Sequence, residues 1–167
     1  MILLWVLLFF SCGDETFPTK NPRLDVFVAA LIEGNYEQDY LDPLPDFSAQ
    51  DIPALLHYAN DFREIAYFPV NPISSFAPPT FRLGECLLWV IEAIRTRTDV
   101  DMDPLRYPSL IPVLINDDNP NEVKGLNEEE LQEAYTLYNN WWEDNRNRDF
   151  NTFRFINPLA GSNYQWR

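Results

Sequence analysis

The chain has 167 residues, and its 46% apolar and 15% aromatic content is typical of one globular domain rather than of a disordered chain. Its 26 acidic residues outnumber its 12 basic residues, giving a net charge of −14 that excludes nucleic-acid binding through a basic face and disfavours adhesion to anionic lipid by charge. Two cysteines and one histidine exclude a zinc finger, a Cys/His cluster and a disulfide-dense scaffold, so we expect neither a metal nor a cofactor.

The chain begins with an apolar run over residues 2–10. Nine residues in a helix span about 14 Å, roughly half of a bilayer core, so the run is too short for a transmembrane anchor. It fits the short apolar core of a secretory signal, although the amino group of Met1 is the only positive charge ahead of it. Either translation begins upstream of Met1, or the run is not a signal. In the second case we expect it to form a buried first strand.

The apolar run is followed by Ser11 and Cys12. This order resembles a bacterial lipoprotein signal, although Phe9 stands where Leu is usual, and the resemblance implies cleavage after Ser11 and acylation of Cys12. The next residues, Gly13-Asp14-Glu15, resemble the export signals of surface lipoproteins of the Bacteroides group. We therefore divide the chain into a signal peptide over 1–11, a tether over 12–20 and one domain over 21–167.

The second cysteine, Cys86, has no partner in the chain if Cys12 carries lipid. We then expect a buried free thiol. If Cys12 carries no lipid, a Cys12–Cys86 disulfide can form in an oxidising compartment.

The domain is predicted to be mostly α: a small bundle of about four helices with long, ordered, proline-rich loops and at most one or two short strands. The first helix begins with Asn21 as N-cap and Pro22 in its first turn, and Gly34 ends it in a left-handed cap. Its buried stripe consists of Leu24, Phe27, Val28, Leu31 and Ile32.

A second helix follows a loop with two prolines. Two phases are open: Ser48 is the N-cap with Asp51 at the third position, or Asp51 is the N-cap with Pro53 in the first turn. In both, the buried face is formed by Ile52, Leu55, Leu56 and Ala59. Residues 62–79 then read as a long ordered loop.

The third helix is expected from about Thr80 to Arg95 and is apolar almost all round, which is typical of a central helix. A narrow polar stripe contains Glu85 and Glu92, which we expect to be solvated, with Glu92 paired to Arg95. Gly84 inside a helix costs about 1 kcal/mol relative to Ala. The close approach of another segment would explain why a glycine is found there.

Residues 110–115 are predicted to form a short strand or a helical turn, which periodicity does not separate. The last helix begins at Asn127 as N-cap with Glu130 at the third position. Its inward stripe consists of Leu131, Ala134, Tyr135, Tyr138, Trp141 and Trp142. The tail over 150–167 is too apolar to be free, so it should pack back on the helices, with one short strand.

One internal echo occurs: residues 52–56 (Ile-Pro-Ala-Leu-Leu) resemble residues 111–115 (Ile-Pro-Val-Leu-Ile). The segments are similar to the first helix of HEAT-type repeats. One echo is too few for a solenoid, because stacked repeats need about three units.

Candidate metal and catalytic residues have simple structural interpretations. Asp99, Asp101 and Asp103 match the first three ligand positions of a calcium loop, but Pro104 and Leu110 replace its Gly and Glu, so a solvated turn is expected. His57 falls opposite the apolar face of its helix, so we expect it in solvent, without a nucleophile or an orienting partner.

Two aromatic residues, Trp141 and Tyr138, are the candidates for stacking on a sugar ring. Aromatic side chains at helical spacing are more often core. Trp141 lies at the edge of the stripe, so we expect it to be partly exposed.

Several stretches together resemble an uncharacterised family of small Bacteroides-group lipoproteins. They are the signal and the segments over 51–56, 71–75, 82–84 and 157–164. None of these motifs is catalytic, so the resemblance transfers no functional residue.

These observations predict a monomeric, non-enzymatic envelope lipoprotein that binds or scaffolds a protein partner. We expect it at the outer membrane, held by a lipid on Cys12. A glycan-binding accessory lipoprotein, taking a neutral glycan, and a carboxylate-dependent hydrolase are the alternatives.

Overall fold

The computed structural model describes residues 21–36, 44–75, 80–97, 105, 107–116 and 125–167. The predicted signal peptide, the tether and the aspartates of the 99–103 segment lie outside these residues. Within them the domain is mostly α, as the sequence predicts. The helices are α1 (Pro22–Glu33), α2 (Ile52–Ala59), α3 (Leu83–Thr96), α4 (Glu128–Asn145) and the short α5 (Phe150–Phe153), with a 3-10 turn η1 (Ala49–Asp51) ahead of α2.

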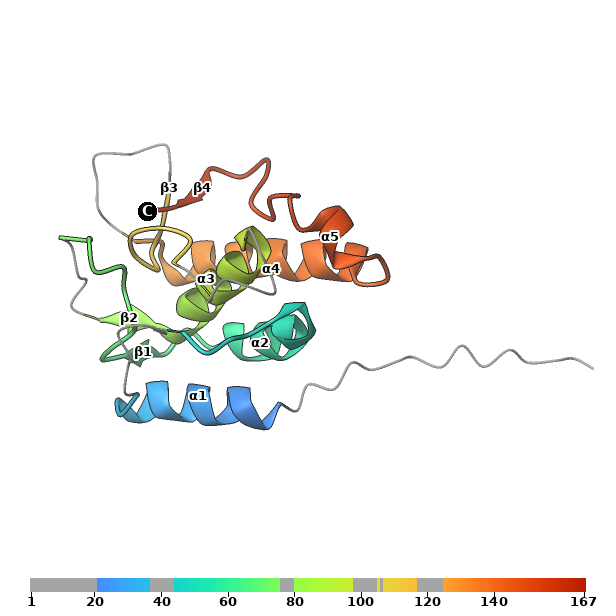
Figure 1. Ribbon diagram of the computed structural model, residues 1–167. Helices are drawn as coiled ribbons and strands as arrows, with labels where there is room; N and C mark the ends of the chain where they lie inside the picture. The colour runs from blue at the N-terminus through green and yellow to red at the C-terminus, as the bar shows by residue number, and fades with distance from the viewer. Residues whose placement is uncertain (1–20, 37–43, 76–79, 98–104, 106, 117–124) are drawn as a thin grey trace, which may run out of the picture.

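Helix α3 lies at the centre of the domain (Figure 1). Helix α2 packs against α3, α1 packs against α2, and α4 contacts both α2 and α3. Two antiparallel two-stranded sheets complete the described fold. The first pairs β1 (Glu64–Ile65) with β2 (Phe81–Arg82), and the second pairs β3 (Leu114–Asn116) with β4 (Tyr164–Trp166).

Helix α1 has the predicted caps. The side-chain oxygen of Asn21 accepts hydrogen bonds from the amides of Arg23 and Leu24, both at 3.2 Å, and Gly34 ends the helix at φ 71°. The predicted stripe is buried except for Ile32, which is 41% exposed. Ile32 lies at the edge of the stripe, beyond the surface that the neighbouring segments cover.

Both predicted starts of the second helix occur, one after the other. Ser48 and Asp51 form a capping box around η1, and the α-helix proper then begins at Ile52, with Pro53 in its first turn. Pro53 therefore does not interrupt the helix, because its missing amide falls where no intrahelical partner is available.

Helix α3 begins three residues later than expected, because Phe81 and Arg82 pair with β1. The segment over 62–79, predicted to be a loop, therefore contains the strand β1. The close approach predicted at Gly84 is confirmed: a Cβ there would lie 2.2 Å from the carbonyl oxygen of Ala59. Gly84 thus allows α2 and α3 to touch through their backbones.

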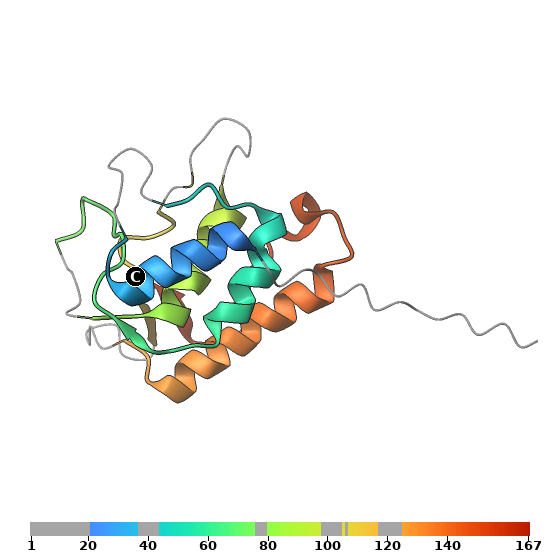
Figure 2. The same cartoon turned by 90° about the horizontal axis from the view of Figure 1, so that it is seen from below.

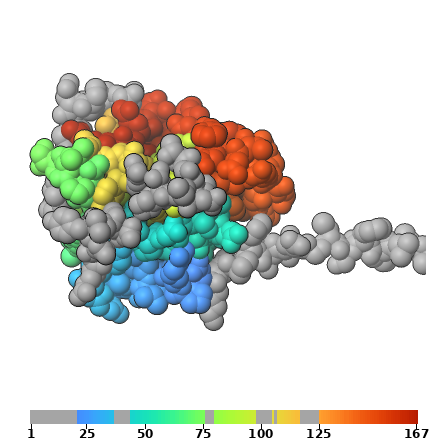
Figure 3. Space-filling view, in the orientation of Figure 1, coloured from blue at the N-terminus to red at the C-terminus, as the bar shows by residue number. Residues whose placement is uncertain are grey.

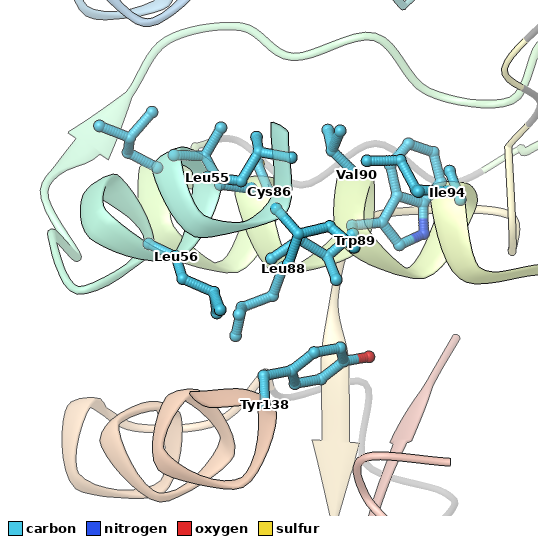
Figure 4. Close-up of a cluster of buried hydrophobic side chains, with 14 of the residues drawn as sticks. Leu55, Leu56, Cys86, Leu88, Trp89, Val90, Ile94 and Tyr138 are labelled. Atoms are coloured by element: carbon cyan, nitrogen blue, oxygen red, sulfur yellow. The ribbon is translucent and has the colours of Figure 1, made fainter. Parts of the chain in front are cut away.

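The core surrounds α3, as Figure 4 shows for side chains from α2, α3 and α4. Every residue of α3 from Leu83 to Arg95 is buried. Cys86 is a buried free thiol, as expected, and burial raises its pKa well above the usual value.

The carboxyl-terminal region packs as predicted. Helix α4 has the Asn127–Glu130 capping box. The tail turns back through α5 and adds β4 to β3, so the ambiguous 110–115 segment ends in a strand. The internal echo has no structural counterpart, because residues 52–56 are helical whereas 111–115 form bends and the start of β3.

Candidate functional site

A cluster of buried polar side chains joins α3, α4 and the carboxyl-terminal segment. The carboxylate of Glu92 on α3 accepts a hydrogen bond from the Tyr138 hydroxyl at 2.9 Å. The indole N–H of Trp166 on β4 donates to the same hydroxyl oxygen at 2.8 Å. Arg95, one turn along α3, donates to both oxygens of Glu92, through its Nε at 2.9 Å and through Nη2. A chain of hydrogen bonds from Trp166 through the Tyr138 hydroxyl to the Glu92 carboxylate therefore links β4, α4 and α3.

Arg95 is also bonded to the turn after α5. Its Nη1 donates to the carbonyl oxygen of Arg154 at 2.9 Å, and the Nε of Arg154 donates to the carbonyl oxygen of Arg95 at 3.0 Å. Both arginines are buried. This reciprocal pair fixes the end of α3 to the α5 turn.

A second buried carboxylate, Glu85, lies in the first turn of α3 and is 6% exposed. Its Oε1 accepts the amide of Leu114 on β3 at 2.6 Å. Burial raises the pKa of Glu85 to about 7, against the opposing effects of this hydrogen bond and of the charge on Arg82.

The prediction that Glu85 and Glu92 lie on a solvated stripe is wrong. Both are less than a tenth exposed, because β3 covers Glu85 while α4 and the tail cover Glu92. The predicted Glu92–Arg95 ion pair is present, but it is buried. The partners of both carboxylates come from 29 and 46 residues away, which helical periodicity does not reveal.

Trp141 and Tyr138, the candidate stacking residues, lie in the core. Tyr138 is fully buried and Trp141 is 5% exposed, so the expectation of a partly exposed Trp141 was wrong. The reason is α5, which brings the ring of Phe153 to 5.4 Å from that of Trp141. Neither ring presents a face to a ligand in this structure. Within the described residues the indole N–H of Trp141 has no hydrogen-bond partner.

The remaining candidate residues are placed as follows. His57 is exposed, as predicted. Among the described residues, no three His, Cys, Asp or Glu side chains gather as metal ligands. A search of the same residues found no helix with the length and hydropathy to cross a membrane.

An apolar pair is exposed at the turn after α5. Phe155 is 77% exposed and Ile156 is 46% exposed. The buried guanidinium of Arg154 lies 5.1 Å from the centre of the Phe155 ring. Two further arginines, Arg146 and Arg148, precede α5.

The chain belongs to the family described as Domain of unknown function (DUF4943), whose model matches residues 18–167. This confirms that the family is an uncharacterised one. No curated protein matches the chain, and no solved structure matches it either.

Proposed function

We propose that the protein is an envelope lipoprotein, acylated on Cys12, whose folded domain is a non-enzymatic binding or scaffolding module. The observation that carries this proposal is the order of an apolar run, Ser11 and Cys12 directly ahead of the domain. The family match begins at residue 18, after the cysteine, which agrees with a signal and tether placed before a separate folded unit.

The buried polar groups support a structural rather than a catalytic use. The oxygens of Glu92 bind Arg95 and Tyr138, and the carboxylate of Asp51 binds Asn21 and the Ser48 amide. The Glu92–Tyr138 bond joins α3 to α4, the bond of Asp51 to Asn21 joins η1 to the start of α1, and the bond of Asp51 to the Ser48 amide caps η1. The Glu92–Arg95 pair lies within α3 and neutralises the buried carboxylate. A general acid or base needs a proton-transfer atom within hydrogen-bond reach of substrate, and these atoms are occupied by the protein itself.

A hydrolase is the second candidate, because Glu85 has a pKa raised to about 7, as a general acid requires. Its burial and its bond to the Leu114 amide favour a structural role instead. Hydrolysis of any glycan by the wild-type chain that is lost in Glu85→Gln, with folding intact, would establish the enzyme.

The anchor is tested by detergent phase partitioning of the full chain expressed with its signal. Wild type should enter the detergent phase, and Cys12→Ser should move to the aqueous phase. Cys86→Ala is the matched control, because it removes the other thiol and leaves the proposed lipid site; it should partition like wild type. Unchanged partitioning of Cys12→Ser would refute the lipoprotein assignment.

The binding role is tested by two parallel measurements on the anchored chain. One is capture of envelope proteins from outer-membrane extract, and the other is binding to an array of neutral glycans. Saturable binding in the first supports a protein partner, whereas saturable binding in the second supports the glycan-binding alternative.

A further inference from the structure

Two arginines of the α5 region have no carboxylate partner among the described residues. Arg148 donates to the side-chain oxygen of Asn145 at 2.6 Å, and the Nε of Arg154 donates to the carbonyl oxygen of Arg95 at 3.0 Å. Both acceptors are neutral, although acidic residues outnumber basic residues 26 to 12 in the chain. Other arginines of the described residues do form ion pairs: Arg23, Arg63, Arg95, Arg97 and Arg146. The α5 region therefore holds cations that the described part of the chain does not pair.

The guanidinium of Arg154 is the more confined of the two. The residue is 5% exposed, and the rings of Phe150 and Phe155 lie 5.9 Å and 5.1 Å from its Cζ. Within the described residues no protein atom accepts a hydrogen bond from its Nη1 or Nη2. Burial and the charge of Arg95 lower the pKa of Arg154. A confined cation without an anion is costly, so this group is suited to binding one.

The free edge of this guanidinium sets the chemistry of its ligand. Because Nε is occupied by the carbonyl oxygen of Arg95, Nη1 and Nη2 remain as donors in one plane. Such an edge matches the two oxygens of a carboxylate. A singly charged ligand is favoured over a doubly charged phosphate, because one guanidinium is open and the chain carries −14.

Exposed apolar side chains follow Arg154 directly. Phe155 is 77% exposed and Ile156 is 46% exposed, on a turn in which the Ile156 amide donates to the carbonyl oxygen of Phe153 at 2.8 Å. Phe153 itself is buried against Trp141, so the turn is anchored in the core. The ring of Phe155 lies over the guanidinium and is otherwise exposed, so a rotation of this side chain opens the guanidinium and leaves the ring beside it.

The α5 region lies at the surface of the domain. In Figures 1 and 2, α5 lies beside the carboxyl-terminal end of α4. In Figure 3 the orange surface of the α4–α5 region forms part of the visible face. A ligand in solution therefore reaches this region without passing through the core.

We propose that Arg154, with Phe155 and Ile156, binds a small organic carboxylate that has an apolar body. Nη1 and Nη2 of Arg154 donate to the two carboxylate oxygens, and the two apolar side chains pack on the body of the ligand. Arg148, unpaired in the same region, adds favourable potential for an anion. This inference rests on the proposed binding role, to which it adds a ligand class, and it does not depend on the lipid on Cys12.

The test is a titration of the isotope-labelled full chain in detergent micelles, followed by NMR. The probe is phenylacetate, and phenylacetamide is its neutral counterpart of the same shape. Phenylacetate should shift the amide signals of residues 150–156 and the Nε–H signal of Arg154 in a saturable manner. Phenylacetamide at the same concentrations should leave these signals in place, and inorganic phosphate should bind more weakly than phenylacetate.

Variants separate the charge from the apolar contact. Arg154→Met should weaken phenylacetate about ten-fold or more, because it removes hydrogen bonds to a charged group. Arg154→Lys should lie between, because it keeps the charge without the planar pair of donors. Arg63→Met is the control, because it removes an exposed arginine elsewhere and should bind like wild type. Phe155→Ser keeps the cation, so it should weaken phenylacetate several-fold and leave acetate unchanged, which tests the site even if Arg154→Met does not fold.

Equal responses to phenylacetate and phenylacetamide would overturn the carboxylate site, as would wild-type affinity in folded Arg154→Met or in Phe155→Ser. A chain that does not respond to phenylacetate but captures a protein or a neutral glycan in the assays above would overturn this site and leave the binding role standing. A chain that binds nothing in any of these assays would overturn both.

Discussion

The Leu114 amide on β3 points at the carboxylate of Glu85 on α3, with 2.6 Å between nitrogen and Oε1. This bond joins the central helix to the β3–β4 sheet. The carboxyl group of Glu85 remains protonated to unusually high pH, because burial raises its pKa to about 7, well above the ordinary value for a glutamate. The stability of this junction should therefore depend on pH.

The first prediction concerns that dependence. The folded pKa of Glu85 lies above the unfolded value, so the folded state binds more protons between them. Its contribution to stability is complete below about pH 4.5 and is lost as the pH rises through about 7. A shift of this size corresponds to about 3 kcal/mol. Urea unfolding at pH 5 and pH 8 gives the fall in the free energy of unfolding between the two pH values. This fall should be smaller in Glu85→Gln than in wild type, by up to that amount.

The control for Glu85→Gln is Glu129→Gln, which changes an exposed residue in the first turn of α4. It should alter the free energy of unfolding equally at the two pH values. An identical pH dependence in wild type and Glu85→Gln would contradict the assignment of the shifted pKa to Glu85.

The second prediction concerns the buried ion pair. Arg95→Met leaves Glu92 buried without its cation and also removes the bond to the Arg154 carbonyl. Breaking a buried pair from one side costs about 3 to 5 kcal/mol. The matched control is Arg63→Met, which breaks an exposed pair with Asp61 and should cost at most about 1 kcal/mol. Equal midpoints for the two variants in urea unfolding would show that the buried pair contributes no more than a surface pair.

The third prediction concerns the contact of α2 with α3. Gly84→Ala places a methyl group 2.2 Å from the Ala59 carbonyl oxygen, so the helices must separate. Overpacking of this kind costs about 1 to 3 kcal/mol. Gly125→Ala is the control, because its methyl group would meet Val113 at an ordinary 3.4 Å. Thermal unfolding should show a lower Tm for Gly84→Ala, and a Tm as high as that of the control would contradict the close contact of α2 with α3 at Gly84.

The fourth prediction uses Cys86 as a probe of core opening. In the Cys12→Ser background it is the sole thiol, and it is buried with a raised pKa. A thiol reagent should therefore label it only when the domain unfolds. Ile94→Ala, on the same helix, should cost about 2 to 5 kcal/mol and accelerate labelling accordingly. Rapid labelling of the native Cys12→Ser chain would contradict the central position of α3.

The parts of the fold that sequence predicts well are those fixed by neighbouring residues. The caps of α1 and α4 depend on side chains within three residues of the helix start, and Gly34 is fixed by its own left-handed backbone. The two sheets are harder to predict from sequence, because strands of two or three residues are too short to show an alternating pattern. For that reason the predicted α3 began at Thr80 and included the two residues of β2.

The buried carboxylates were missed for a different reason. A glutamate on one face of an apolar helix reads as a solvent-facing stripe unless its partner is known. The partners of Glu92 and Glu85 are Tyr138 and the Leu114 amide, and only the folded chain brings them together. The exposure predicted for Trp141 likewise considered only the sequence of α4. In the folded chain α5 covers this side chain through Phe153.

Acylation of Cys12 as the first residue of the mature protein is tested by intact mass spectrometry of the chain purified from membranes of a bacterial host that processes lipoproteins. We expect a mass equal to residues 12–167 plus the acyl groups, and we expect Cys12→Ser to abolish this species. A mature chain that keeps residues 1–11, or one that begins elsewhere without lipid, would contradict it.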